Sequence, residues 1–227
     1  MKLEIKKINK EFNRRESKFF AVNNINLTIG QNDFISIIGH SGSGKSTLLN
    51  LIAGLLNPTS GDILLDGKSI INLKDSEISE IRNKKIGYIL QGQSLLPNLT
   101  VLENVKLPFE LLNNGNVNEY ALELLDKAGI KHLADSYPST LSGGEAKRVS
   151  VVRALINKPE ILLADEPTSD LDEENTEIIM KLFSEISRSG TAVLMVTHNL
   201  STINYGNAIY EMKNGILTRK TEKIVKK

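Results

Sequence analysis

The chain alternates short apolar runs with longer amphipathic stretches. Four runs are nearly all apolar, which is typical of strands that are buried on both faces of a parallel sheet. They are residues 35–38, 86–90, 161–164 and 192–196. Residues 3–5 and 25–29 instead alternate apolar and polar positions, as antiparallel strands with one exposed face do, and residues 61–67 form a short strand between turn residues. The pattern predicts an α/β fold with a mainly parallel sheet and an antiparallel β edge.

Residues from about 94 to 139 have a different pattern. Their apolar positions follow a helical period, most clearly over residues 117–128, and Pro97, Pro108 and the sequence Asn113-Asn114-Gly115 interrupt it. We therefore expect one domain over residues 1–227, with a small helical subdomain at about 94–139. The core around it is formed by residues 1–93 and 140–227. The basic tail, residues 220–227, is expected to be a solvated end.

Composition restricts the function further. The chain has 227 residues, 40% of them hydrophobic, and a formal net charge of +1, so the overall charge does not favour nucleic acid as a partner. It has no cysteine, which excludes disulfides, zinc–thiolate sites and thiol catalysis and suits a reducing interior. Its apolar runs are far shorter than the roughly twenty residues that a membrane-spanning helix needs. We expect a cytoplasmic protein, with any membrane-spanning partner on a separate chain.

A glycine-rich segment, GHSGSGKST, directly follows the apolar run at residues 34–38. It matches the phosphate-binding pattern G-x-x-x-x-G-K-[ST], in which bare backbone amides surround phosphate oxygens. A helix that begins near Ser46 and runs to about Leu56 adds its positive N-terminal end. We expect Lys45 to contact the β- and γ-phosphates and the Ser46 hydroxyl to bind magnesium. The alternative is a glycine-rich turn that binds nothing. The predicted phosphate-binding residues are Gly39, His40, Ser41, Gly42, Ser43, Gly44, Lys45, Ser46 and Thr47.

Two carboxylates follow the apolar run at residues 161–164. Asp165 and Glu166 stand at the carboxyl end of a predicted strand, beside the glycine-rich loop in an open sheet. Asp165 is suited to hold Mg²⁺ together with Ser46, and Glu166 is suited to polarise a water molecule for attack on the γ-phosphate. An acidic turn without function is the alternative.

The sequence LSGGE at residues 141–145 opens a second predicted helix, over residues 145–157. Its bare amides make it a second candidate anion site. A serine N-cap followed by a glycine turn is the alternative, and that interpretation leaves the second of the two glycines unexplained.

The order of these motifs resembles that of ABC-type ATPases over essentially the whole chain. It runs GHSGSGKST, Gln91, LSGGE, ILLADE, the sequence SDLD at residues 169–172, and His198. The segments PTSGDILLDGK, IGYILQ, LLPNLTVLENVKLP and VTHN are similar to one branch, the small ATPases that partner macrolide-, lipoprotein- and antimicrobial-peptide-handling membrane proteins.

The resemblance implies roles for individual residues. Gln91 begins the Q-loop, which touches the magnesium shell and leads into the segment that meets the membrane subunit. Asp165 ends the Walker B motif, Glu166 is the catalytic base, and His198 senses the γ-phosphate. Phe12 stacks on adenine, with Phe19 and Phe20 as competitors for that role. Residues 169–172 lie at a dimer interface, and the signature residues are Ser142, Gly143, Gly144 and Glu145.

Three positions depart from the family pattern. The signature continues Glu145-Ala146-Lys147-Arg148 where a glutamine-rich run is more usual. Asn199 follows His198 where aspartate is typical, and the insert around residues 113–120 is shorter and less arginine-rich than is usual in this branch.

The resemblance implies a subunit that binds and hydrolyses ATP with Mg²⁺. It would drive a separate membrane permease, of export or mechanotransmission type, as a head-to-tail dimer with ATP between the copies. The alternative is a regulatory ATPase of the cell-division type, which signals through a membrane partner without moving a substrate. Translation- and repair-type relatives carry two cassettes, coiled coils or zinc sites, and a P-loop kinase has no use for LSGGE.

Overall fold

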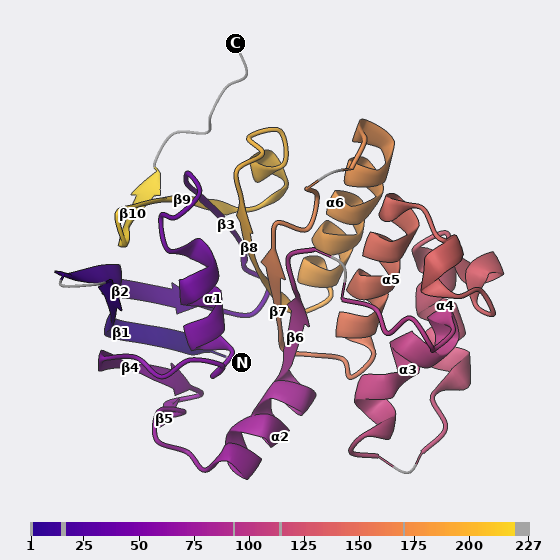
Figure 1. The fold of residues 1–227 in the computed structure, drawn as a ribbon, viewed down its shortest axis with the longest axis horizontal. Coiled ribbons are helices and arrows are strands. Elements are labelled where there is room, and N and C mark those ends of the chain that lie inside the picture. Colours follow the sequence, from indigo (N-terminus) through magenta and orange to yellow (C-terminus); the bar gives the residue numbers. More distant parts are fainter. Residues whose placement is uncertain (1, 15–16, 93, 114, 170, 221–227) are drawn as a thin grey trace.

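The computed structural model describes residues 2–14, 17–92, 94–113, 115–169 and 171–220. Two β-sheets and a layer of helices make up this part of the chain (Figure 1). The predicted α/β fold, with a mainly parallel sheet and an antiparallel β region, is confirmed. Asp170 of the SDLD sequence and residues 221–227 of the basic tail lie outside the described residues.

The central sheet has six strands in the order β10-β9-β3-β8-β7-β6. Neighbours from β9 to β6 run parallel, and β10 is antiparallel to β9. The strands are β3 (Phe34–Ile38), β6 (Ile86–Ile89), β7 (Ile161–Asp165), β8 (Ala192–Thr197), β9 (Ala208–Lys213) and β10 (Ile216–Lys220). Every residue of β3, β7 and β8 is buried, which is why these strands are apolar runs without alternation.

The second sheet is antiparallel, in the order β2-β1-β4-β5. It contains β1 (Leu3–Arg14), β2 (Ser17–Ile29), β4 (Ser60–Leu65) and β5 (Lys68–Ser69). The β1–β2 hairpin is much longer than the two short strands predicted from alternation. Its outer half has no regular alternation of apolar and polar positions, and the register shifts near Ile8 and Lys10, so backbone pairing extends the hairpin where no alternating pattern is present.

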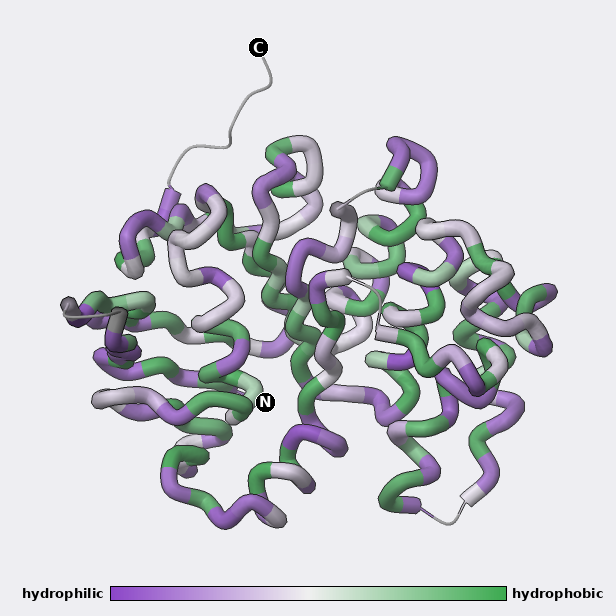
Figure 2. The backbone as a smooth tube through the Cα atoms, in the orientation of Figure 1, coloured by the Kyte–Doolittle hydropathy of each residue, from purple (hydrophilic) through white to green (hydrophobic). Residues whose placement is uncertain are grey.

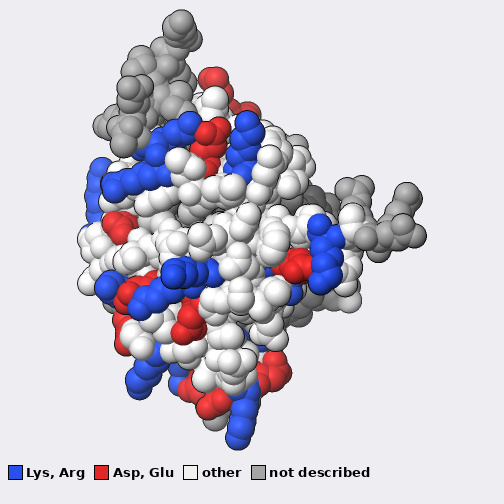
Figure 3. Space-filling view, turned by 90° about the vertical axis from the view of Figure 1, so that its left-hand side faces the viewer, with Lys and Arg blue, Asp and Glu red and all other residues white. Residues whose placement is uncertain are grey.

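The face of the molecule on the side of this sheet carries cations and anions close together (Figure 3). On β1, the Glu4 carboxylate lies 3.3 Å from the ammonium groups of both Lys2 and Lys6. Exposed pairs of this kind add little to the free energy of unfolding.

The helices cover both faces of the central sheet. Helix α1 (Lys45–Ile52) lies between the two sheets, and α3 to α6 form a layer on the other side, on the right in Figure 1. The remaining α-helices are α2 (Asp75–Lys85), α3 (Val101–Glu110), α4 (Asn118–Lys127), α5 (Gly143–Leu155) and α6 (Glu173–Arg188). Short 3-10 helices span Lys131–Leu133, Pro138–Thr140 and Ile203–Tyr205.

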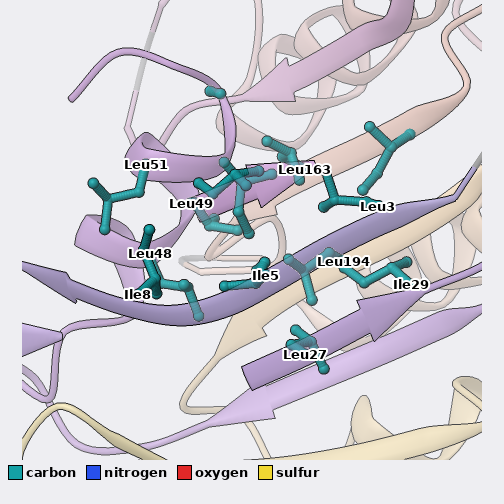
Figure 4. Close-up of a cluster of buried hydrophobic side chains, with 14 of the residues drawn as sticks. Leu3, Ile5, Ile8, Leu27, Ile29, Leu48, Leu49, Leu51, Leu163 and Leu194 are labelled. Atoms are coloured by element: carbon teal, nitrogen blue, oxygen red, sulfur yellow. The ribbon is translucent and has the colours of Figure 1, made fainter. Parts of the chain in front are cut away.

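Two apolar cores result from this layering. Side chains of α1, such as Leu48, face Ile5 and Ile8 of β1 in the first core (Figure 4). The second core lies between the central sheet and α3–α6. Because side chains alternate along a strand, Leu163 belongs to the first core and its neighbour Leu162 to the second. Figure 2 shows the resulting hydrophobic centre, with hydrophilic segments mainly at the periphery.

Helix α1 ends earlier than the sequence predicts, at Ile52 and not near Leu56. Gly54 adopts φ +63°, its N–H bonds the Leu51 carbonyl, and the N–H of Leu55 bonds the Asn50 carbonyl. This is the Schellman arrangement that ends many helices at a left-handed glycine. Therefore the glycine, and not the apolar pattern around it, sets the end of the helix.

Candidate nucleotide-binding site

A cavity of about 620 Å³ lies where the glycine-rich loop, the hairpin and the ends of the central strands meet. A cavity of about 700 Å³ between α2, α3, α4 and α5 is larger but has no glycine loop, so the chemistry of the lining and not the volume identifies the site. The smaller cavity is lined by Phe12, Phe19, Ala21, Ser41, Gly42, Ser43, Gly44, Lys45, Ser46, Thr47, Gln91, Glu166 and His198.

The glycine-rich loop is closely packed against neighbouring backbone. Gly44, the residue before α1, has φ +107°, and a Cβ there would collide with the Ala21 carbonyl of β2. A Cβ on Gly39 would collide with the Met212 carbonyl of β9. Both positions therefore accept only glycine, and the loop is shaped by two strands that are distant in sequence.

Lys45, in the first turn of α1, is buried and folded over its own loop. Its Nζ donates hydrogen bonds to the carbonyl oxygens of Gly39 (2.7 Å) and His40 (3.2 Å) and lies 3.9 Å from Oε1 of Glu166. A buried ammonium group needs such partners because its desolvation is costly. The same donors can turn to phosphate oxygens placed in the cavity.

Glu166 joins the ends of β7 and β8. Its N–H bonds the Val196 carbonyl at 3.0 Å, and its Oε2 accepts from the backbone N–H of His198 (3.2 Å) and lies 2.9 Å from His198 Nδ1. Glu166 has φ +48°, a left-handed conformation that costs a non-glycine residue on the order of 1 kcal/mol. The surrounding strands thus hold this carboxylate at the edge of the cavity in a strained backbone position.

Asp165 is the last residue of β7 and is buried. Burial raises the pKa of its carboxyl above the usual value, and a hydrogen bond from the Ser46 side chain opposes that rise. Glu166 adds to the increase in pKa, whereas Lys45 and Lys147 counteract it. Within the described residues, Asp165 Oδ1 is buried without a hydrogen-bond partner, so a cation can bind there beside the Ser46 oxygen.

That cation would be held only partly by protein groups. No cluster of three or more His, Cys, Asp or Glu side chains suited to a metal occurs in the described part of the chain. One carboxylate and one hydroxyl fit Mg²⁺, which usually completes its shell with water and substrate phosphates.

Two aromatic rings stand at the other end of the cavity. Phe12 and Phe19 are opposite each other in the β1–β2 hairpin, and their ring centroids are 6.0 Å apart with an angle of 30° between the planes. The Lys10 ammonium group lies 5.2 Å from the Phe12 centroid. Phe20, the third candidate, does not line the cavity. The structure therefore leaves Phe12 and Phe19 as the rings that can face a planar base.

The signature residues are capped within their own turn. Ser142 precedes α5, its Oγ accepts from the N–H of Glu145 (3.3 Å), and the Glu145 carboxylate accepts from the Ser142 N–H (2.7 Å) and hydroxyl (2.8 Å). A Cβ on Gly143 would meet no atom within 4 Å, whereas one on Gly144 would lie 2.8 Å from the Asn175 side chain of α6. The two glycines are therefore needed for different reasons. Gly144 lets helix α6 pack closely against the turn, and Gly143 leaves the surface of the turn accessible.

The signature turn does not reach the cavity of its own chain. None of its four residues lines the 620 Å³ cavity, and Gly143 instead lines a separate cavity of about 440 Å³ with Gly92, Lys147, Ser169 and Leu171 among others. The structure therefore brings the predicted loop, carboxylates, Gln91 and His198 together, and keeps the predicted second anion site apart from them.

The segment that begins at Gln91 is held by three side chains that the sequence reasoning did not identify as functional. Lys147 and Arg153 of α5 bond the backbone at Leu90 and Ser94, and Asn104 of α3 bonds the backbone of Leu96 through both its side-chain atoms. The sequence contains one indication of this role for Lys147. It lies in the run A-K-R-V-S-V-V-R, on the helix whose apolar side chains face the core.

No helix in the described residues is long and apolar enough to span a membrane.

Comparisons with known proteins agree with this geometry. Residues 22–169 match the family model described as ABC transporter. The chain is 43% identical, over 92% of its length and 93% of the relative's, to the lipoprotein-releasing system ATP-binding protein LolD of Buchnera aphidicola subsp. Schizaphis graminum. It resembles two dimeric structures of the ATP-binding cassette MJ0796, one of them bound to ADP and Pi, with a TM-score of 0.89 and 38% identity over 96% of this chain and 98% of that one. The chain belongs to the ATP-binding, ATP-hydrolysing cassettes of the ABC transporter family.

Proposed function

We propose that this chain is the ATPase subunit of an ABC transporter, and that it drives a separate membrane permease by closing and opening a dimer of two copies. The observation that carries the proposal is that one chain holds two glycine-marked helix N-termini, and only that of α1 lies in the cavity with Glu166 and His198. If a second copy presented its α5 N-terminus to the nucleotide bound at α1, both helix N-termini would contact the same phosphates.

Within each site, the loop amides and Lys45 would bind the phosphates, and Phe12 would stack on adenine, with Phe19 beside it. Glu166 would orient and deprotonate the attacking water, and His198, 2.9 Å from that carboxylate, would respond to the γ-phosphate. Ser46 and Asp165, with Gln91 close by in the lining, would hold Mg²⁺, which supplies charge neutralisation for the phosphates when bound.

The partner copy would contribute Ser142, Gly143 and Gly144 to the nucleotide. Gly143 is suited to a close approach, since no described atom outside its own helix turn lies within 4 Å of where a Cβ would stand. The dimers of the MJ0796 cassette support this assembly by similarity. Hydrolysis removes the group that both copies hold, so the dimer would then open.

The permease would lie on another chain, and this subunit would work at the inner face of the cell membrane. The similarity to a lipoprotein-releasing system subunit supports an export or mechanotransmission type. The test is purification of the tagged chain from detergent-solubilised membranes, with the Glu166→Gln variant used to favour the ATP-bound form. We expect a multi-spanning membrane protein to co-purify and to stimulate ATP turnover when it is added to the parent chain.

A matched control separates a specific partner from adherent membrane proteins. Lys45→Ala, which should bind ATP only weakly, should retain less of the partner in the presence of Mg-ATP than Glu166→Gln does. Recovery of no membrane protein with either variant would contradict the transporter assignment. A partner that stimulates turnover without moving any solute or lipid-anchored cargo would favour the regulatory type.

A further inference from the structure

Buried charge is concentrated at the nucleotide site, with one addition. In the described part of the chain, the charged residues that are buried are Lys45, Lys147, Asp165 and Glu166. Three of them belong to the site already described. The fourth, Lys147, is on α5, five residues after the N-cap Ser142, and is 7% exposed. An ammonium group is expensive to bury, and an apolar side chain of similar length would fill the space at lower cost. The lysine therefore calls for a reason other than packing.

Lys147 contacts the peptide group that leads into Gln91. Its Nζ donates to the carbonyl oxygen of Leu90 at 3.4 Å. This oxygen belongs to the same planar unit as the N–H of Gln91, so holding it restricts the backbone from which the Gln91 side chain extends. Gln91 lines the nucleotide cavity with Glu166 and His198. The same ammonium group also counteracts the increase in the pKa of Asp165.

Helix α5 also bonds the chain four residues further on, at Ser94. The Arg153 guanidinium of α5 donates to the Ser94 carbonyl (2.8 Å) and hydroxyl (2.6 Å). Gly92, between the two attachments, adopts φ +79°. Helix α5 begins at the signature residues, so one rigid element carries both the signature turn and the two anchors of the Gln91 segment.

We propose that Lys147 is a positioning residue of the ATPase site, which holds the Leu90–Gln91 peptide and so ties the position of Gln91 to that of the signature helix. Holding this peptide keeps the Gln91 side chain in the lining of the cavity with Glu166 and His198. The inference rests on the proposed role of Gln91. Arg153 holds the chain at Ser94, and Lys147 holds it at the Leu90–Gln91 peptide, from which the Gln91 side chain extends.

The test compares Lys147→Met, which removes the donor, with Lys147→Arg, which keeps a charged donor. We expect Lys147→Met to lower kcat about tenfold, as the loss of one hydrogen bond to a charged group does, and to leave ATP affinity within about twofold. Thermal unfolding should show that the variant still folds cooperatively, because methionine fills a space of similar size. Lys147→Arg should recover most of the turnover. Lys181→Met, on the exposed side of α6, is the matched control and should behave like the parent.

A double-mutant cycle with Gln91→Ala decides whether Lys147 acts through Gln91. In the Gln91→Ala background, Lys147→Met should cause no further loss of kcat. Equal losses in both backgrounds, or a Lys147→Met variant with the turnover of the parent, would overturn the inference while Gln91 kept its proposed role. If Gln91→Ala itself has normal turnover, the proposed role of Gln91 is wrong, and the inference fails with it. Lys147→Leu repeats the experiment if the methionine variant does not fold.

Discussion

The glycine-rich loop and the signature turn are both helix N-termini with glycines and hydroxyls, yet they are built in opposite ways. Around the loop, two strands press on Gly39 and Gly44, and Lys45 and Glu166 are buried beside it. Around the signature turn, Ser142 and Gly143 are exposed, and the turn's own Glu145 satisfies the N-cap. One site is nearly complete within the chain, and the other is presented to the outside.

This difference predicts how the glycine-rich loop and the signature turn should each respond to substitution of their residues. Side chains at the loop already interact with one another, so removing one should alter nucleotide binding or chemistry in an isolated chain. The signature turn makes few contacts beyond its own cap, so removing its groups should affect ATP turnover only when a second copy is present.

The largest effect is expected at Glu166. Glu166→Gln keeps the size of the side chain and removes its basicity, so kcat should fall about a thousandfold, within the usual contribution of a general base. The affinity for Mg-ATP should stay within a few-fold of the parent value, as measured by fluorescence titration. Glu174→Gln, in the exposed first turn of α6, is the control. A variant that retains more than a tenth of the parent turnover would show that another group acts as the base.

Lys45→Ala should act on binding. The ammonium group bonds two loop carbonyls and is free to exchange them for phosphate oxygens, so its removal should lower ATP affinity roughly a hundredfold. Calorimetric titration measures the affinity, and far-UV circular dichroism checks that the fold is intact. Lys127→Ala, on an exposed face of α4, should bind ATP normally. Parent-like affinity in Lys45→Ala would mean that the loop does not bind the phosphates.

Phe12→Ala should weaken ATP binding by roughly 1–3 kcal/mol if the ring stacks on adenine. Binding of inorganic tripolyphosphate, which has no base, should be unchanged. Phe19→Ala measures how much of the loss of affinity comes from the second ring of the stacked pair. Phe20→Ala is the matched control because Phe20 does not line the cavity. An equal loss of affinity for ATP and tripolyphosphate would indicate that Phe12 only supports the hairpin.

The smallest effect concerns the cap of the signature turn. The N–H and hydroxyl of Ser142 lower the pKa of Glu145 below its usual value of 4.5. A lowered pKa contributes stability above pH 4.5 that is lost as the pH falls through the folded-state pKa. Glu145→Ala should therefore reduce the free energy of unfolding by a few tenths of a kcal/mol (at most about 1 kcal/mol) at pH 7, because solvent screens this carboxylate, and the difference should shrink in acid. Glu145→Gln, which can still accept the bonds, should vary less with pH. A pH-independent difference would exclude the charged cap.

Most of the loop region could be predicted from the sequence because its chemistry is local. The spacing of Gly39, Gly44 and Lys45 and the end of β7 at Asp165 indicate the groups proposed to bind phosphate and magnesium without knowledge of the rest of the fold. The long hairpin that brings Phe12 and Phe19 to the cavity was not predictable, since its outer half has no apolar alternation and depends on backbone pairing.

The two signature glycines illustrate the same limit. The sequence predicts the Ser142 cap and the helix after it, and it leaves the second glycine without a reason. That reason is a contact with Asn175, thirty-one positions away, on a helix that the apolar pattern did not predict. Lys147 is similar: its position in the helix is visible in the sequence, but the Leu90 carbonyl that it bonds becomes its neighbour only in the folded chain.

The oligomeric state of Glu166→Gln, measured by light scattering, decides whether two copies join head to tail around ATP. If the signature turn completes a partner's site, the variant should be a monomer without nucleotide and a dimer with Mg-ATP, because bound ATP accumulates when hydrolysis is blocked. Adding Ser142→Arg, which places a bulky side chain at the exposed turn, should return the protein to a monomer with ATP affinity little changed. A double variant that still dimerises with Mg-ATP would contradict the head-to-tail arrangement, even if Glu166 proves to be the catalytic base.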